Sequence, residues 1–152
     1  MSGLERLEFL VGRWKGSSTD QFGEKGTIES SLECTKELDG RFFQLRGAST
    51  KDGAVINTAV TFITFDSKAG KYISKRMWSY GFIENGVGRW EDDRTLMFEI
   101  KFDNEPLPFV GTRWRSFIRR YSDDELGHGL YTAKEGGQFQ LYGETRQIRV
   151  RT

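Results

Sequence analysis

The fold class follows from an alternation that is clearest in TLMFEIKF, residues 95–102. Every even-numbered position there, from Leu96 to Phe102, is large and apolar, whereas the charged residues Glu99 and Lys101 fall at odd positions. Successive side chains of a β-strand point to opposite faces, so a period of two indicates a strand with one buried and one wet face. This stretch is therefore predicted to be a half-buried strand.

The same period recurs along the chain and is interrupted at regular intervals by turn signals. Residues 27–34 and 72–80 alternate in the same way. Asp-Gly and Asn-Gly dipeptides supply the positive φ angles that tight hairpin turns require. Between the turn signals the chain has room for about ten strands joined by hairpins, which is typical of all-β sandwiches and barrels. The turn signals occur at 38–40, 51–53, 66–70, 84–86, 92–93, 122–124 and 135–137.

Closure into a barrel is favoured because an open sheet would leave two unpaired edges. We therefore predict an all-β fold, a single up-and-down antiparallel barrel of about ten strands. Because 152 residues make one ordinary domain, residues 1–152 are expected to form it together. A short N-terminal helix over residues 4–11 is expected to plug one end. Residues 105–108 hold both prolines and are expected to form the one longer loop.

The composition excludes several classes of site. One Cys and one His rule out a disulfide framework and a zinc site built from these residues alone. A formal net charge of +1 argues against a dedicated polyanion binder. No apolar stretch reaches the length of a signal peptide or a membrane helix. The lone Cys34 is expected to be a small buried core residue, and the cytoplasm is the default compartment.

Motifs spread over residues 7–146 resemble a known family. In chain order they are FLVGRW at 9–14, LDGRF at 38–42, Phe65-Asp66 followed by Lys71-Tyr72, RWR at 113–115 and Thr145-Arg146. This order resembles the calycin superfamily of lipocalin-like barrels, and more closely a family of small bacterial lipocalin-like domains of unknown function. The resemblance implies a lipocalin-like barrel with an internal cavity, and it brings no catalytic residues. Residues 22–40 lack the helical pair that fatty-acid-binding members carry after their first strand.

The resemblance also implies a structural pair at the closed end of the barrel. There the guanidinium of Arg146 is expected to lie over the indole of Trp14, which belongs to the first strand. A contact of this kind contributes roughly 0.5 to 2 kcal/mol.

The expected function is to bind a small, largely hydrophobic molecule, because a barrel of this size has room for about one small ligand. Three residues are expected to fix the polar end of the ligand: Arg76, Tyr142 and Glu144. If Arg76 faces inward, it needs either Glu144 or an anionic ligand as its partner. The apolar lining is expected from Phe43, Leu45, Trp78, Phe98, Ile100 and Trp114.

Other interpretations of these residues stay open. The face that carries Arg76 and Trp78 could point outward as an aromatic surface. The residues Tyr142, Glu144 and Arg146 could form only an internal salt bridge. The same cavity could also serve a cofactor-free isomerase or cyclase, with Glu144 or Tyr142 as its acid or base.

Two further alternatives rest on single features. His128, the only His, could ligate haem inside a large apolar pocket, although its flanking glycines suggest a bulge or an exposed bend. Arg113, Arg115 and Arg119 are expected to face water as a basic stripe, which could meet an acidic partner or only protect the sheet.

The remaining expectations concern cofactors and partners. The chain is predicted to need no cofactor or metal and to bind neither nucleic acid nor a membrane. Its expected partner is the small hydrophobic ligand, and its expected state is a monomer or homodimer in the cytoplasm.

Overall fold

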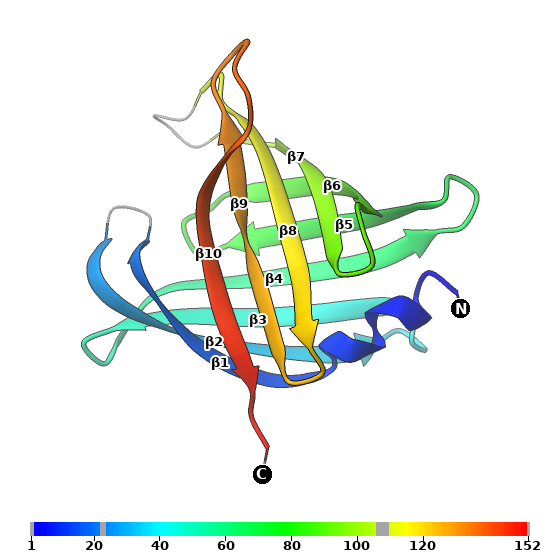
Figure 1. The fold of residues 1–152 in the computed structure, drawn as a ribbon, viewed down its shortest axis with the longest axis horizontal. Coiled ribbons are helices and arrows are strands. Elements are labelled where there is room, and N and C mark those ends of the chain that lie inside the picture. The colour runs from blue at the N-terminus through cyan, green and yellow to red at the C-terminus, as the bar shows by residue number, and fades with distance from the viewer. Residues whose placement is uncertain (1, 22–23, 106–109, 152) are drawn as a thin grey trace.

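The computed structural model describes residues 2–21, 24–105 and 110–151. Within these ranges ten antiparallel strands form a closed barrel in which each strand pairs with the next and β10 returns to pair with β1 (Figure 1). The predicted all-β, up-and-down barrel is therefore confirmed. The elements are η1 (Glu5–Leu10), β1 (Gly12–Gln21), β2 (Glu24–Glu37), β3 (Phe42–Lys51), β4 (Ala54–Asp66), β5 (Lys71–Trp78), β6 (Ile83–Trp90), β7 (Thr95–Phe102), β8 (Arg113–Ser122), β9 (Glu125–Ala133) and β10 (Gln140–Arg149).

One continuous inward face runs around the barrel because residues paired across neighbouring strands point to the same side of the sheet. Phe98 of β7 pairs with Gly88 of β6 and with Ser116 of β8, which in turn pairs with Leu130 of β9. The alternating stretches at 27–34 and 95–102 lie in β2 and β7, and the stretch at 72–80 lies in β5 as far as Trp78. Their apolar positions Ile28, Tyr72 and Leu96 are buried. The period of two was thus a sound guide to the inward face.

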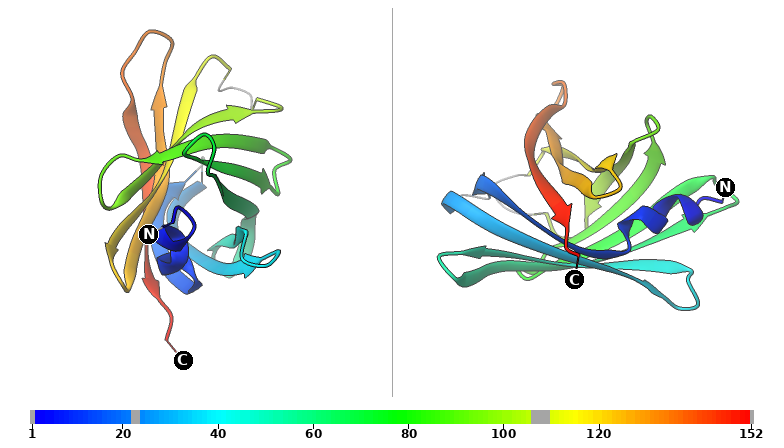
Figure 2. Two further views of the ribbon diagram at one scale, coloured as in Figure 1. Left: turned by 90° about the vertical axis from the view of Figure 1, so that its right-hand side faces the viewer. Right: turned by 60° about the horizontal axis from the view of Figure 1, so that its bottom comes forward.

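Large side chains fill one end of the barrel, and the N-terminal helix lies across that end (Figure 2, left). The helix is 3-10 rather than α, and its Leu7 and Leu10 are fully buried against Trp14 and Phe43. Cys34 is a core residue there, as expected, and burial raises the pKa of its thiol to about 12, so the thiol stays protonated. Among the described residues, no helix is long and apolar enough to cross a membrane.

One of the predicted turns is wrong. Residues 84–86 lie inside β6, and the chain turns earlier, around Gly81, whose φ is +92°. Glycine at position 86 allows close packing inside the strand and does not mark a turn. A Cβ on Gly86 would lie 2.2 Å from Ser74 Oγ and 3.2 Å from the Phe98 ring. The loop expected at 105–108 falls mostly on residues 106–108, which lie outside the described residues.

The aromatic partner of Arg146 was also predicted wrongly. The guanidinium over Trp14 belongs to Arg149, with its Cζ 4.2 Å from the ring centre. The register explains this, because Trp14 pairs with Arg149 across β1 and β10, whereas Arg146 pairs with Ser17. Arg146 lies on the outer face, with its Cζ 3.7 Å from the centre of the Tyr121 ring.

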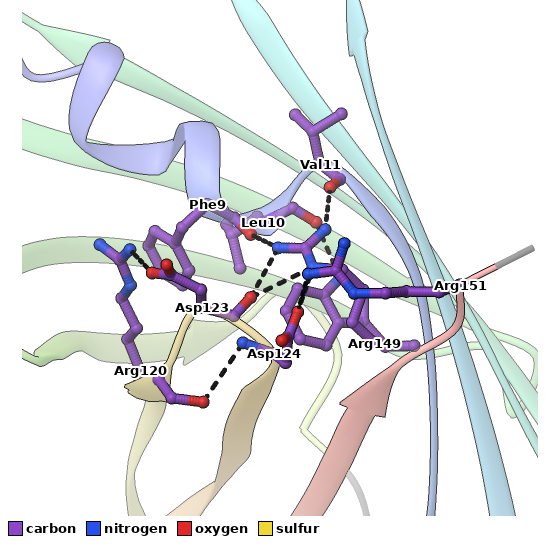
Figure 3. Close-up of polar contacts among 10 residues, drawn as sticks. Phe9, Leu10, Val11, Arg120, Asp123, Asp124, Arg149 and Arg151 are labelled. Carbon is purple, nitrogen blue, oxygen red and sulfur yellow. Dashed lines mark hydrogen bonds and ion pairs between the residues drawn. The ribbon is translucent and has the colours of Figure 1, made fainter.

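Arg149 binds the end of the helix to the barrel (Figure 3). Its Nη1 donates to the Val11 carbonyl at 2.7 Å, and its Nη2 donates to the carbonyls of Phe9 at 2.8 Å and Asp123 at 3.0 Å. Trp14 Nε1 donates to the Leu10 carbonyl at 2.9 Å. Carbonyls at a helix C-terminus have no partner within the helix, so these two side chains satisfy three consecutive orphan acceptors. Arg149 thereby joins η1, β1, β10 and the turn between β8 and β9.

Arg149→Ala is expected to lower the free energy of unfolding by about 3 kcal/mol, because it leaves the partly buried carbonyls of Phe9 and Val11 unpaired and uncovers the Trp14 ring. The matched control is Arg146→Ala in the same strand, where the side chain is 57% exposed. That variant is expected to lose less than about 1 kcal/mol. Urea unfolding followed by tryptophan fluorescence measures both, and equal losses would show that Arg149 has no special role.

Candidate functional site

A cavity of about 470 Å³ occupies the part of the barrel interior that the packed core leaves empty. This volume lies in the range of small-molecule sites in proteins. At the closed end the cavity meets Leu10 of η1 together with Ile118 and Leu126. Farther along the barrel it exists because the inward positions of β1 to β4 carry small side chains. These positions include Ser18, Ser30, Gly47, Ser49, Ala59 and Thr61.

The cavity opens where β1 and β10 separate. Their ladder runs only from Trp14–Arg149 to Ser17–Arg146, whereas β1 continues to pair with β2 as far as Gln21. The two strands diverge beyond that ladder (Figure 1). The residues that line this side of the cavity are Ser17, Ser18 and Thr19 from β1 and Tyr142 to Gln147 from β10. Tyr142 sits at a break in the β9–β10 register, and its ring centre lies 6.0 Å from that of Trp114.

Arg76, which lines the cavity, forms an ion pair with the buried Glu84. Arg76 Nη1 lies 3.8 Å from Oε2 of Glu84, whose side chain is only 4% exposed. Arg76 Nε donates to Thr61 Oγ1 at 2.9 Å, and Trp78 Nε1 donates to Glu84 Oε1 at 2.8 Å. Glu84 therefore partly offsets the Arg76 charge within the protein, and both of its carboxylate oxygens face a donor.

Three buried polar atoms on the cavity wall have no hydrogen-bond partner among the residues that the structure describes: Ser18 Oγ, His128 Nε2 and Gln147 Oε1. Gln147 is only 1% exposed, and its Nε2 donates to Ser30 Oγ at 3.0 Å. Buried polar atoms are nearly always paired, and an unpaired one costs about 1 to 3 kcal/mol. The three atoms therefore leave hydrogen-bonding capacity on the cavity wall that the described residues do not use.

His128 faces the cavity from β9 rather than lying in an exposed bend. It pairs with Thr145, a buried inward residue of β10. The glycines on either side of His128 do not form a bend; a side chain at either position would clash with β10. A Cβ on Gly129 would lie 2.0 Å from the Gly143 carbonyl oxygen, and one on Gly127 would lie 2.1 Å from Glu144 Oε2. They allow β10 to pass close to β9 on the outer side.

The imidazole of His128 is uncharged at neutral pH. Burial, and after it the positive charge of Arg76, lower its pKa from 6.5 to about 4, while the neighbouring Gln147 side chain, which can accept a hydrogen bond from the charged imidazole, raises it. A neutral imidazole offers one nitrogen that donates and one that accepts a hydrogen bond.

Glu144 was expected to orient a ligand inside the barrel, but its carboxylate is held by residues of the outer face. Glu144 contributes to the edge of the cavity, but it pairs with outward-facing Gly129, and its carboxylate lies on the outer face. There it accepts a hydrogen bond from Tyr121 Oη, and it lies 3.7 Å from Arg119 Nη1 and 4.0 Å from Arg146 Nε. Its expected role as a catalytic acid or base within the cavity loses its geometric basis.

The other predicted ligand residues divide into two groups. The cavity lining includes Leu45, Arg76, Trp78 and Tyr142. The remaining four point inward but are packed elsewhere in the interior, and Phe98 covers the faces of Gly86 and Gly88. These four residues are Phe43, Phe98, Ile100 and Trp114.

Three residues at or beside the cavity were not predicted from the sequence: Glu84, Gln147 and Ser18. Glu84 was hidden by the Asn85-Gly86 dipeptide, which resembles a hairpin turn but lies within β6. Gln147 and Ser18 carry no motif, and only the register of β1 and β10 shows that they face the cavity.

The basic stripe faces outward as predicted, and its charges have partners within the molecule. Arg113 and Arg115 both stack on the Phe139 ring, with Cζ distances of 4.9 and 4.0 Å to its centre. Arg119 Nε donates to Thr95 Oγ1 at 3.0 Å. In the described part of the chain, no cluster of three or more His, Cys, Asp or Glu side chains could hold a metal ion.

Comparison with known proteins identifies a family and a fold. The model of a family described as "Protein of unknown function (DUF1579)" matches residues 4–149. The solved structure of Rv2717c from M. tuberculosis is 16% identical, with a TM-score of 0.74 over 99% of each chain. The S-type phycobiliprotein lyase CPES from Guillardia theta is 14% identical, with a TM-score of 0.58 over 100% of this chain and 94% of that chain. At these identities the likeness shows the fold alone. No curated protein matches the chain in sequence.

His128 is expected to make stability depend on pH in a defined window. Because its pKa falls from 6.5 to about 4 on folding, the unfolded chain binds more protons between these values, and the free energy of unfolding falls as the pH is lowered from 6.5 to about 4. The loss attributable to His128 is up to about 3 kcal/mol. His128→Gln should flatten this part of the profile in urea unfolding measured at several pH values. An unchanged slope would mean that His128 is not buried in its neutral form.

Proposed function

We propose that this chain, which belongs to the DUF1579 family of proteins of unknown function, binds a small organic molecule inside a lipocalin-like barrel. The observation that carries the proposal is the cavity of about 470 Å³ with three unpartnered polar atoms on its wall. A mostly preformed pocket with a few convergent polar groups is the usual form of a small-molecule site.

The ligand is amphipathic rather than largely hydrophobic. Leu45, Trp78 and Leu130 provide apolar surface for its body. Ser18, His128 and Gln147 provide hydrogen-bonding groups for its polar end. Water alone could pair the polar atoms, but it would gain nothing from the apolar wall, whereas an amphipathic ligand benefits from both. The single buried thiol of Cys34 is compatible with a cytoplasmic location.

A second candidate ligand is haem, and His128 is the observation that favours it. Its Nε2 faces the cavity without a partner among the described residues, and the imidazole is neutral at physiological pH. A single neutral imidazole is the haem ligand in globins and peroxidases.

A hemin titration followed by absorption spectroscopy tests this second candidate. If haem binds through His128, a shifted Soret band should appear with the unmodified protein and disappear with His128→Ala. A spectrum that stays that of free hemin would exclude haem.

The main proposal predicts that filling the cavity with a larger side chain weakens ligand binding. Ala59→Phe places a ring inside the cavity, so binding of the neutral fluorescent probe N-phenyl-1-naphthylamine should weaken about tenfold or more. Thr58→Phe is the matched control, because Thr58 is the exposed neighbour on β4, and it should leave the probe affinity unchanged. Circular dichroism checks that both variants fold. Equal affinity in both variants, or no binding by the unmodified protein, would refute the proposal.

A further inference from the structure

The cavity carries no charge that could balance an anionic ligand. Among the described residues that line it, Arg76 is the only cation whose side chain points inward, and its Nη1 already lies 3.8 Å from the Glu84 carboxylate, which offsets its charge. His128 is uncharged at neutral pH. Arg146 also touches the rim, but its guanidinium lies on the outer face beside Glu125 at 3.6 Å and Glu144 at 4.0 Å. A buried anion without an opposite charge is strongly disfavoured, so a carboxylate head group would be bound poorly.

Gln147 adds a requirement of a different kind. Its Nε2 is committed to Ser30 Oγ at 3.0 Å, so the group left unpaired is the carbonyl oxygen Oε1. A carbonyl oxygen accepts hydrogen bonds and cannot donate one. His128 lies beside Gln147, but in the structure the two side chains make no hydrogen bond at this oxygen. A ligand atom that pairs with Gln147 Oε1 must therefore carry a hydrogen. The other two unpaired groups, Ser18 Oγ and His128 Nε2, can adapt, since a hydroxyl rotates and an imidazole can change its tautomer.

These two observations are independent and point to the same chemistry. An ionised carboxylate meets neither requirement, because it is charged and has no hydrogen to donate. An ester is neutral but also lacks a donor. A primary amide or an alcohol is neutral and supplies both a donor and an acceptor.

We propose that the cavity selects a neutral amphipathic ligand whose head group donates a hydrogen bond to Gln147 Oε1, such as a primary amide or an alcohol, and discriminates against carboxylates. This inference rests on the proposed function, since it specifies the class of ligand that the same cavity binds.

Three probes with the same chain length separate charge from hydrogen bonding: decanamide, methyl decanoate and decanoate. Isothermal titration with the unmodified protein at neutral pH should show decanamide binding about tenfold more tightly than methyl decanoate. Decanoate should bind about tenfold more weakly again, because it adds an unbalanced charge. Decanoate binding as tightly as decanamide would overturn the inference. Failure of all three probes to bind would instead count against the proposed function.

Two variants test the two requirements separately. Gln147→Leu removes the unpaired oxygen, so decanamide and methyl decanoate should bind with similar affinity. Glu84→Gln keeps an acceptor for Trp78 Nε1 but releases the charge of Arg76, so decanoate affinity should rise about tenfold while decanamide affinity changes little. Unchanged selectivity in both folded variants would show that neither residue sets the preference. If either variant does not fold, the comparison of the three probes on the unmodified protein still decides the question.

Discussion

The barrel depends on the seam between β1 and β10, where a ladder of four residue pairs closes the ring. The two strands approach closely because position 16 is glycine, on which a Cβ would lie 1.9 Å from the Arg146 carbonyl oxygen. Arg149 secures the end of this seam by stacking on Trp14 and by binding the carbonyls of Phe9 and Val11. One guanidinium therefore holds the first strand, the last strand and the helix that covers the closed end.

The shortness of the seam also explains where the cavity opens. Beyond Ser17 and Arg146 the two strands separate, so their edges line an opening instead of continuing the ladder. Large side chains at the closed end provide stability, whereas the small inward residues farther along leave the interior empty. Among the described residues, three polar atoms on this part of the wall lack a hydrogen-bond partner, whereas Arg76 is paired with Glu84. The packed core and the proposed ligand cavity thus occupy opposite ends of one barrel.

Much of the fold could be predicted because a period of two is a direct physical signature of a half-buried strand, as residues 95–102 show. The site was harder because inward and outward faces differ by a single residue of register. Tyr142, Glu144 and Arg146 were grouped by spacing, yet beyond the register break at Tyr142 the large inward residues of β10 are Thr145, Gln147 and Arg149. The structural role of a glycine was also difficult to predict from the sequence. At Gly86 and Gly129 it permits close packing rather than a turn, and only three-dimensional neighbours distinguish the two purposes.

The central claim is that Ser18, His128 and Gln147 are arranged for a neutral ligand that donates a hydrogen bond. A crystal structure of the protein with decanamide tests it most directly. The amide should lie within hydrogen-bond distance of Gln147 Oε1, with the alkyl chain against Leu45 and Leu130. The claim would be contradicted if protein side chains filled the interior, or if the probe bound elsewhere while Gln147 and His128 were paired with protein groups.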